Sequence, residues 1–186
     1  SQAEHQHLLR VAEKRPGWMI AVAEPQFCDE GTVEALHGYP AAHPYLRGMK
    51  DTLDLIKREA PREVLDIGSP LAQNVAVDAL VPSLTVLDIR PHPDPSLGLK
   101  FIQGSSCSIP FQDASQGFIT SLWTLCHVGY GRYGDALIAE GDSETLREIS
   151  RVLWPSGLAI LGIGPIANEP SVFFNVHRIY SWSWLY

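Results

Sequence analysis

The sequence has few cysteines, no long apolar run and no excess of positive charge. Its three cysteines, Cys28, Cys107 and Cys126, form no C-x-x-C pair, which argues against a zinc site and favours a reduced, cytoplasmic setting. No apolar run reaches the ~20 residues that span a bilayer, so we expect neither a membrane span nor a signal peptide. The formal net charge of −7 argues against binding to nucleic acid or anionic membranes through bulk charge.

A chain of 186 residues that is 45% hydrophobic is long enough for one globular domain with a substantial core. We expect residues 1–60 to form an N-terminal segment of helix and loop that packs on the core, and residues 61–186 to form the main domain. Apolar residues recur at steps of three and four between residues 44 and 59, which predicts an amphipathic helix there.

The main domain alternates short apolar runs with stretches of helical length. Expected strands cover residues 64–67, 84–89, 99–103, 118–123 and 158–163, and expected helices cover 72–80 and 143–153. The strands are apolar on both faces, which is typical of parallel strands covered by helices on each side. A Pro-Ser-Gly sequence at 155–157 predicts a tight turn into the last strand, with Gly157 at positive φ. The pattern indicates a Rossmann-like three-layer α/β sandwich.

The first strand, turn, helix and second strand have the form of a nucleoside site in an open α/β sheet. A glycine turn lets a ligand approach the backbone, and an acid that ends the second strand accepts hydrogen bonds from a ribose. Gly68 and Ser69 lie in that turn, Asp88 and Ile89 end the second strand, and Asp66 is expected to organise the turn. A pyrophosphate would require three glycines, so a cofactor without phosphate at this point, such as S-adenosylmethionine, is the better match.

From residue 63 to residue 180 the order and spacing of motifs resemble the class I S-adenosylmethionine-dependent methyltransferases. EVLDIG at 63–68 is similar to that family's first motif, Asp88 to its ribose-binding acid, and FIQGSS at 101–106 to its third-strand motif. The resemblance implies a mostly parallel sheet of strand order 3-2-1-4-5, in which the usual C-terminal strands are lacking or truncated. It implies S-adenosylmethionine as cofactor and a small molecule as acceptor. The adenine would lie near Ser105, Ser106 and Cys107.

Two motifs resemble a narrower, uncharacterised branch of methyltransferase-like proteins associated with glycan biosynthesis: HVGYGRYGD at 127–135 and FNVHRIY at 174–180. The chain departs from the wider family at Ser105, where an aspartate usually pairs with the adenine amino group, and at Cys126, where an acid usually stands. Each lost charge-assisted contact costs ~1–3 kcal/mol, so we expect the cofactor to bind weakly.

These two motifs supply the candidate catalytic residues. His127 follows the fourth strand at the edge where ligands bind, and an imidazole of near-neutral pKa suits a base or orienting group for methyl transfer to a hydroxyl. His177 is the second candidate. The candidate substrate contacts are Arg132, Tyr133, Asp135, Asn175 and Arg178. The alternative is a structural role, in which His127 is hydrogen-bonded in a loop and Arg132 pairs with Asp135 to pin that loop.

The resemblance implies methylation of a hydroxyl group on a sugar or a secondary metabolite. One alternative is an enzyme of this fold that no longer uses S-adenosylmethionine and performs an elimination, cyclisation or isomerisation. Another is a non-catalytic, methyltransferase-like subunit of a complex. The chain ends in the aromatic sequence SWSWLY at 181–186, and we predict that this segment packs against a second subunit, either the same chain or a different one.

Overall fold

The computed structural model describes residues 19–22, 44–164, 166–174, 176–181 and 183. Most of the predicted N-terminal segment, the candidate Asn175 and residues 182 and 184–186 of the C-terminal sequence lie outside the described residues. Within the described ranges, no helix is long and apolar enough to cross a membrane.

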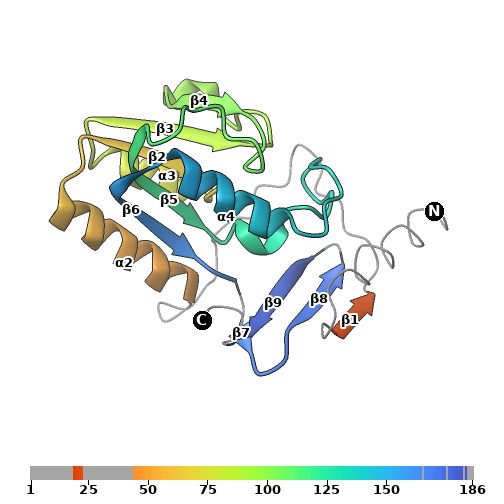
Figure 1. Cartoon of the computed structure of the whole chain (residues 1–186). Helices are drawn as coiled ribbons and strands as arrows, with labels where there is room; N and C mark the ends of the chain where they lie inside the picture. Colours follow the sequence, from red (N-terminus) through yellow and green to blue (C-terminus); the bar gives the residue numbers. More distant parts are fainter. Residues whose placement is uncertain (1–18, 23–43, 165, 175, 182, 184–186) are drawn as a thin grey trace.

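A five-stranded parallel sheet forms the centre of the molecule (Figure 1). Its strands are β2 (Glu63–Ile67), β3 (Ser83–Asp88), β4 (Lys100–Gln103), β5 (Gln116–Leu122) and β6 (Leu153–Gly162). They lie in the order β4-β3-β2-β5-β6, and each neighbouring pair is parallel. The predicted Rossmann-like class and the strand order 3-2-1-4-5 are therefore confirmed.

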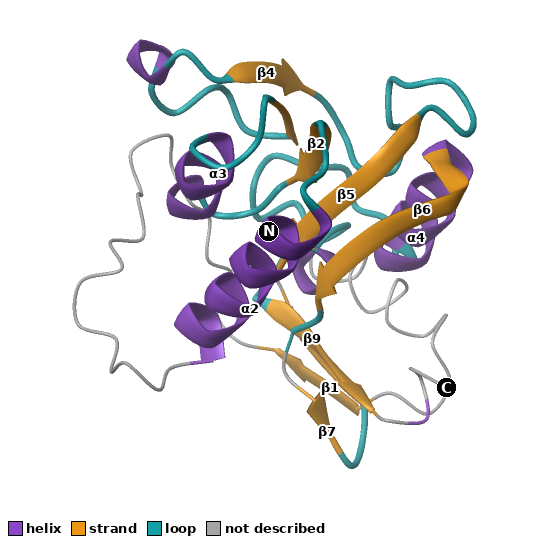
Figure 2. Cartoon of the chain, turned by 90° about the vertical axis from the view of Figure 1, so that its left-hand side faces the viewer, coloured by secondary structure: helices purple, strands orange, loops and turns teal. Residues whose placement is uncertain are grey.

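Helices cover both faces of this sheet, as the doubly apolar strands predicted. α2 (Pro44–Glu59) and α3 (Leu71–Asp78) lie on one face, and α4 (Gly141–Val152) lies on the other (Figure 2). Val64 belongs to a buried cluster with Ile56 of α2, whereas its neighbour Leu65 belongs to a cluster with Ile149 of α4. Successive side chains of a strand point to opposite faces, so β2 needs apolar residues at both positions.

A second, smaller sheet was not predicted. It consists of β1 (Met19–Val22), β7 (Ile166–Ala167), β8 (Ser171–Phe174) and β9 (His177–Ser181), in the order β1-β8-β9-β7. The arrowheads of β5 and β6 point toward it in Figure 1, so it lies beyond the carboxyl ends of those strands. β9 contacts the short 3₁₀ helix η2 (Leu125–His127) that follows β5. The chain after β6 therefore returns to the edge of the main sheet where ligands bind in such folds.

The predicted turn at 155–157 is wrong. β6 begins at Leu153, directly after α4, and runs through Gly157, which is absent from the glycines with positive φ. The glycine is instead required by close packing. A Cβ atom at Gly157 would lie 2.7 Å from Leu153 Cδ1 and 3.1 Å from the Gly117 carbonyl oxygen, next to an irregularity in the pairing of β5 with β6.

Candidate functional site

The turn after β2 is organised by a buried carboxylate. Asp66 is 0% exposed, and its Oδ1 accepts a hydrogen bond from the Ser69 backbone N–H at 3.1 Å. Its Oδ2 accepts bonds from Ser69 Oγ at 2.7 Å and Thr120 Oγ1 at 2.6 Å. Burial raises the pKa of Asp66 to about 6. Asp66 therefore shapes the turn from inside the protein and presents Ser69 beside it.

Gly68 is required in this turn by its conformation and by its surroundings. Its φ is +68°, and a Cβ atom there would lie 2.6 Å from Thr124 Cγ2. The Gly68 N–H donates to the Leu87 carbonyl oxygen at 2.9 Å, and Thr124 Oγ1 donates to the Ile67 carbonyl oxygen at 3.0 Å. The glycine thus holds the turn against the ends of both neighbouring strands, β3 and β5.

Asp88 ends β3 beside this turn, but its carboxylate is already engaged by Arg90. Oδ1 accepts from the Arg90 backbone N–H at 2.8 Å and from its Nε at 3.0 Å, while Oδ2 accepts from Nη2 at 2.5 Å. The Asp88 side chain is 8% exposed and that of Arg90 is 45% exposed. A ribose at Asp88 would have to displace or share this guanidinium. The neighbouring Ile89 accepts a bond from Gln103 Nε2 through its carbonyl oxygen.

The predicted adenine segment lies between the end of β3 and the start of α4. Gly104 N–H donates to the Asp88 carbonyl oxygen at 2.8 Å, which places the segment next to Asp88. Ser105 Oγ accepts from the Cys107 N–H, and Ser106 Oγ lies 2.8 Å from the hydroxyl oxygen of a threonine of α4. Cys107 Sγ donates to a carbonyl oxygen of α4, and burial raises the pKa of its thiol. Asp88 and the three predicted adenine contacts are thus neighbours.

Two buried amides that the sequence interpretation missed follow the same turn. Gln73 is 0% exposed and Asn74 is 3% exposed, both in the first turn of α3. Among the described residues, no hydrogen-bond partner is found for Gln73 Oε1, Gln73 Nε2 or Asn74 Oδ1. Buried polar atoms are nearly always paired, so these three atoms are an exception inside the protein. The sequence pattern that could have identified them is the presence of two amides on the helix face that carries the core residue Val77.

His127, the first candidate base, lies in η2 with a defined tautomer. Its Nδ1 is 2.5 Å from the Val176 carbonyl oxygen, which can only accept, so Nδ1 carries the proton and Nε2 carries the lone pair. Burial lowers the pKa of His127 to about 4, so the imidazole is neutral at pH 7. The ring centroid of His177 is 6.3 Å away, and burial also lowers the pKa of His177. The two candidate bases are therefore neighbours.

Asp135 pins the glycine-rich loop between η2 and α4 through backbone groups. Its Oδ2 accepts from the N–H groups of Gly129 at 2.6 Å and Tyr130 at 3.1 Å, and its Oδ1 accepts from that of Tyr133 at 3.2 Å. The loop carries the Tyr133 ring to 5.7 Å from the His127 ring. Asp135 therefore fixes the loop that places the Tyr133 ring beside His127.

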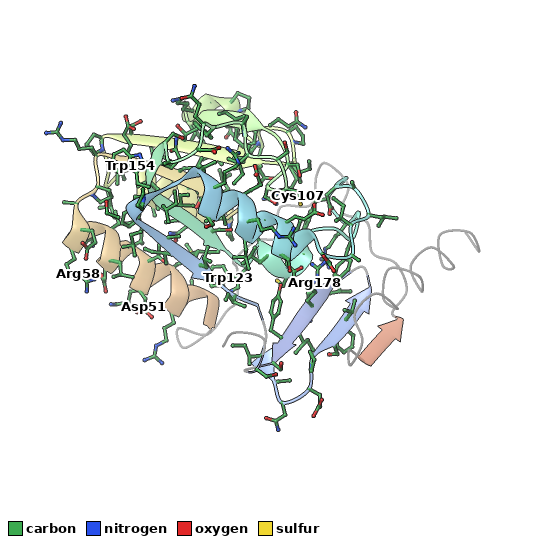
Figure 3. All side chains as sticks on the ribbon, in the orientation of Figure 1. Asp51, Arg58, Cys107, Trp123, Trp154 and Arg178 are labelled. Atoms are coloured by element: carbon green, nitrogen blue, oxygen red, sulfur yellow. The ribbon has the colours of Figure 1, made fainter. Side chains whose placement is uncertain are left out.

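Arg178 lies inside the protein where the second sheet meets η2 (Figure 3). It is 0% exposed, and its guanidinium donates to the carbonyl oxygens of Val128 at 2.5 Å and Ala139 at 3.0 Å. Its Nε is 3.4 Å from Asp142 Oδ2, which also accepts from the Tyr180 hydroxyl at 3.2 Å. The residue predicted to contact substrate therefore holds both ends of the loop that carries Tyr133.

Arg132 and Tyr133, the remaining described candidates, form a row of contacting groups with Arg90 at the carboxyl ends of the strands of the main sheet. The guanidinium of Arg90, held by Asp88, lies 5.3 Å from the centre of the Tyr133 ring, and that of Arg132 lies 5.6 Å from it. Tyr133 in turn contacts His127. The row joins the end of β3 to η2. No group of three or more potential metal ligands occurs among the described residues.

Comparisons with known proteins agree with the fold. A family described as Caenorhabditis protein of unknown function, DUF268, matches residues 108–185. No curated protein shows significant similarity to the chain. The YcgJ protein of Bacillus subtilis is similar in structure, with a TM-score of 0.52, 21% identity and coverage of 66% of this chain and 53% of that one.

Two further solved structures are similar. The [4+2]-cyclase SpnF has a TM-score of 0.53 and 14% identity, with coverage of 80% of this chain and 57% of that one. A putative S-adenosyl-L-methionine-dependent methyltransferase of Methanococcus maripaludis has a TM-score of 0.47 and 21% identity, with coverage of 66% and 58%. The chain spans little more than half the length of these proteins. At such identities the similarity shows the fold alone.

Proposed function

We propose that the protein is an S-adenosylmethionine-dependent methyltransferase that acts on a hydroxyl group of a sugar or secondary metabolite. The observation that carries this proposal is the row of side chains from Asp88 through Arg90 and Tyr133 to His127. The row connects Asp88, whose carboxylate is suited to bind a cofactor ribose, with His127, whose imidazole is suited to bind an acceptor hydroxyl. Both lie where parallel α/β sheets bind their ligands.

The residues beside the Gly68 turn fit the cofactor. Asp88 would hold the ribose once Arg90 moves aside, and the segment 105–107 would border the adenine. S-adenosylmethionine, when bound, supplies an electrophilic methyl group.

The chain's own residues would align and hold the acceptor. Val176 fixes the His127 ring by accepting its Nδ1–H, which leaves Nε2 to accept a hydrogen bond from the acceptor hydroxyl. With a pKa of about 4, His127 is a weak base in the free protein. Its contribution would therefore come mainly from orienting the hydroxyl oxygen, because displacement at a sulfonium methyl depends on in-line alignment.

A second candidate function is an enzyme of this fold that does not use the cofactor. The Asp88 carboxylate already forms a bidentate ion pair with Arg90, so a ribose would have to displace that guanidinium. This ion pair favours the alternative. SpnF is a [4+2]-cyclase with a similar fold, so the fold also occurs in a protein named for another reaction. In that case the row from Arg90 to His127 would hold the substrate of an elimination, cyclisation or isomerisation.

Calorimetry with S-adenosylmethionine and S-adenosylhomocysteine separates the two candidates. Binding by the wild-type chain should be weak, and Asp88→Asn should weaken it at least ~5-fold, since a charge-assisted hydrogen bond is worth ~1–3 kcal/mol. Arg90→Met should strengthen binding by freeing the carboxylate. Asp78→Asn makes the same chemical change at the exposed end of α3 and should have no effect. Absence of heat with both ligands at millimolar concentration would refute the methyltransferase proposal.

A further inference from the structure

Trp123 has a backbone conformation that large side chains rarely adopt. Its φ is +57°, in the left-handed region that favours glycine. The other described residues with positive φ are Ala60, Ala114 and glycines. The bend at Trp123 lies directly between the end of β5 and the start of η2. Strained residues of this kind persist where the surrounding structure imposes them, and they gather at functional sites.

Contacts from three elements hold this conformation. The Trp123 N–H donates to the Gly162 carbonyl oxygen at 2.8 Å, which continues the pairing of β5 with β6. The Trp123 carbonyl oxygen accepts from the Cys126 thiol of η2 at 3.5 Å. The ring packs against α2 so closely that a Cβ atom at Gly48 would lie 2.8 Å from its Cζ2 atom (Figure 3). The backbone of Trp123 is therefore fixed by β6 and η2, and its ring is fixed by α2.

The residues that follow the bend belong to both halves of the candidate site. Thr124 packs on the turn after β2, where a Cβ atom at Gly68 would lie 2.6 Å from its Cγ2 atom. The His127 N–H donates to the Thr124 carbonyl oxygen at 2.9 Å, and His127 Nδ1 reaches the Val176 carbonyl oxygen. A different φ at Trp123 would rotate the chain that follows and carry Thr124 and His127 away from these partners. The position of His127 therefore depends on the bend.

We propose that Trp123 is a positioning residue that fixes the direction of the His127 imidazole. This inference rests on the proposed function only in taking His127 as the group that orients the acceptor hydroxyl. The ring is the part of Trp123 that α2 holds, so a smaller side chain can return to a negative φ and let η2 move away from Val176. Such a movement would displace the Nε2 lone pair, and methyl transfer depends on in-line alignment of the acceptor oxygen.

Nitrogen nuclear magnetic resonance of the imidazoles tests this inference on the intact chain without cofactor or acceptor. The chemical shifts of the two ring nitrogens identify which one carries the proton, and His127→Gln assigns the signals among the seven histidines. At pH 7, Nδ1 of His127 should carry the proton in the wild-type chain. Trp123→Ala should give a mixture of both tautomers. It should also raise the pKa of His127 from about 4 by at least ~1, because burial, the main cause of the low value, is reduced.

Two further variants keep the test decisive if Trp123→Ala does not fold. Gly48→Ala changes only α2 but forces the Trp123 ring to move, so it should shift the His127 signals in the same direction by a smaller amount. Trp154→Ala is the matched control. It removes a half-exposed ring that packs on Gly117, at the opposite end of β5, and should leave the His127 signals unchanged.

A merely stabilising role for Trp123 predicts a different result. His127 would then keep its Nδ1 proton and its pKa in every variant that folds, and that outcome in Trp123→Ala, or in Gly48→Ala where Trp123→Ala does not fold, would overturn the inference. An equal change in Trp154→Ala would overturn it as well. Because neither cofactor nor acceptor takes part, a failure to bind S-adenosylmethionine in calorimetry would leave this result unaffected.

Discussion

Replacing Arg178 by methionine should destabilise the fold strongly. Arg178 and Asp142 are both 0% exposed, and removing one partner of a buried pair costs about 3–5 kcal/mol because the other charge stays buried. The carbonyl oxygens of Val128 and Ala139 would lose their donors as well. For a chain of this size, 1 kcal/mol lowers the Tm by about 2–4 °C, so the expected decrease is about 6–20 °C.

Urea denaturation followed by tryptophan fluorescence measures the effect. Arg147→Met is the matched control, because its only described ion pair is exposed and 3.9 Å long, and such pairs contribute at most ~1 kcal/mol. The double variant Arg178→Met with Asp142→Asn should lose less stability than the sum of the single variants, since it removes both charges. If Arg178→Met unfolds at the urea concentration of the wild-type chain, Arg178 does not hold the loop and its role as a substrate contact gains support.

Three further predictions concern pH, loop geometry and assembly. The pKa of Asp66 rises from 3.8 unfolded to about 6 folded, so the folded state binds more protons between pH 4 and 6. The free energy of unfolding should therefore fall by up to about 3 kcal/mol as the pH rises through that window, and Asp66→Asn should flatten the slope in urea titrations. Gly129→Ala would place a Cβ atom 2.0 Å from a carbonyl oxygen and should lower the Tm well beyond Gly134→Ala, where φ is also positive but space is open. If the aromatic segment 182–186 joins two subunits, light scattering should show an oligomer that a chain ending at residue 181 does not form.

The main sheet was predictable because its residues carry the pattern locally. The helix expected at 44–59 has the observed bounds, since its apolar residues recur at helical spacing and a proline follows it. The strands were recognisable as short runs that are apolar on both faces. The second sheet could not be predicted in this way. β1 pairs with β8 across about 150 residues of chain, and no local pattern specifies such a partner.

The candidate site was predictable only in its residue types. The two motifs contain the candidate bases His127 and His177. In the structure, the centroids of their rings lie 6.3 Å apart. The partners that decide what the other candidates do are mostly backbone groups, which the sequence does not distinguish. Asp135 is engaged by N–H groups and Arg178 by carbonyl oxygens. The engagement of Asp88 by Arg90, only two residues away, could have been anticipated from an acid and a base so spaced.

The match to DUF268 covers one half of the candidate site and leaves out the other half. It covers residues 108–185, which include η2, the glycine-rich loop and β9, and therefore both histidines and Arg132. The turn at Gly68 and the acid at Asp88 precede it. The segment shared with that family is thus the half that would recognise the acceptor, and the half that would hold a cofactor lies outside it. Calorimetry with S-adenosylmethionine therefore tests the half of the candidate site that lies outside the matched residues.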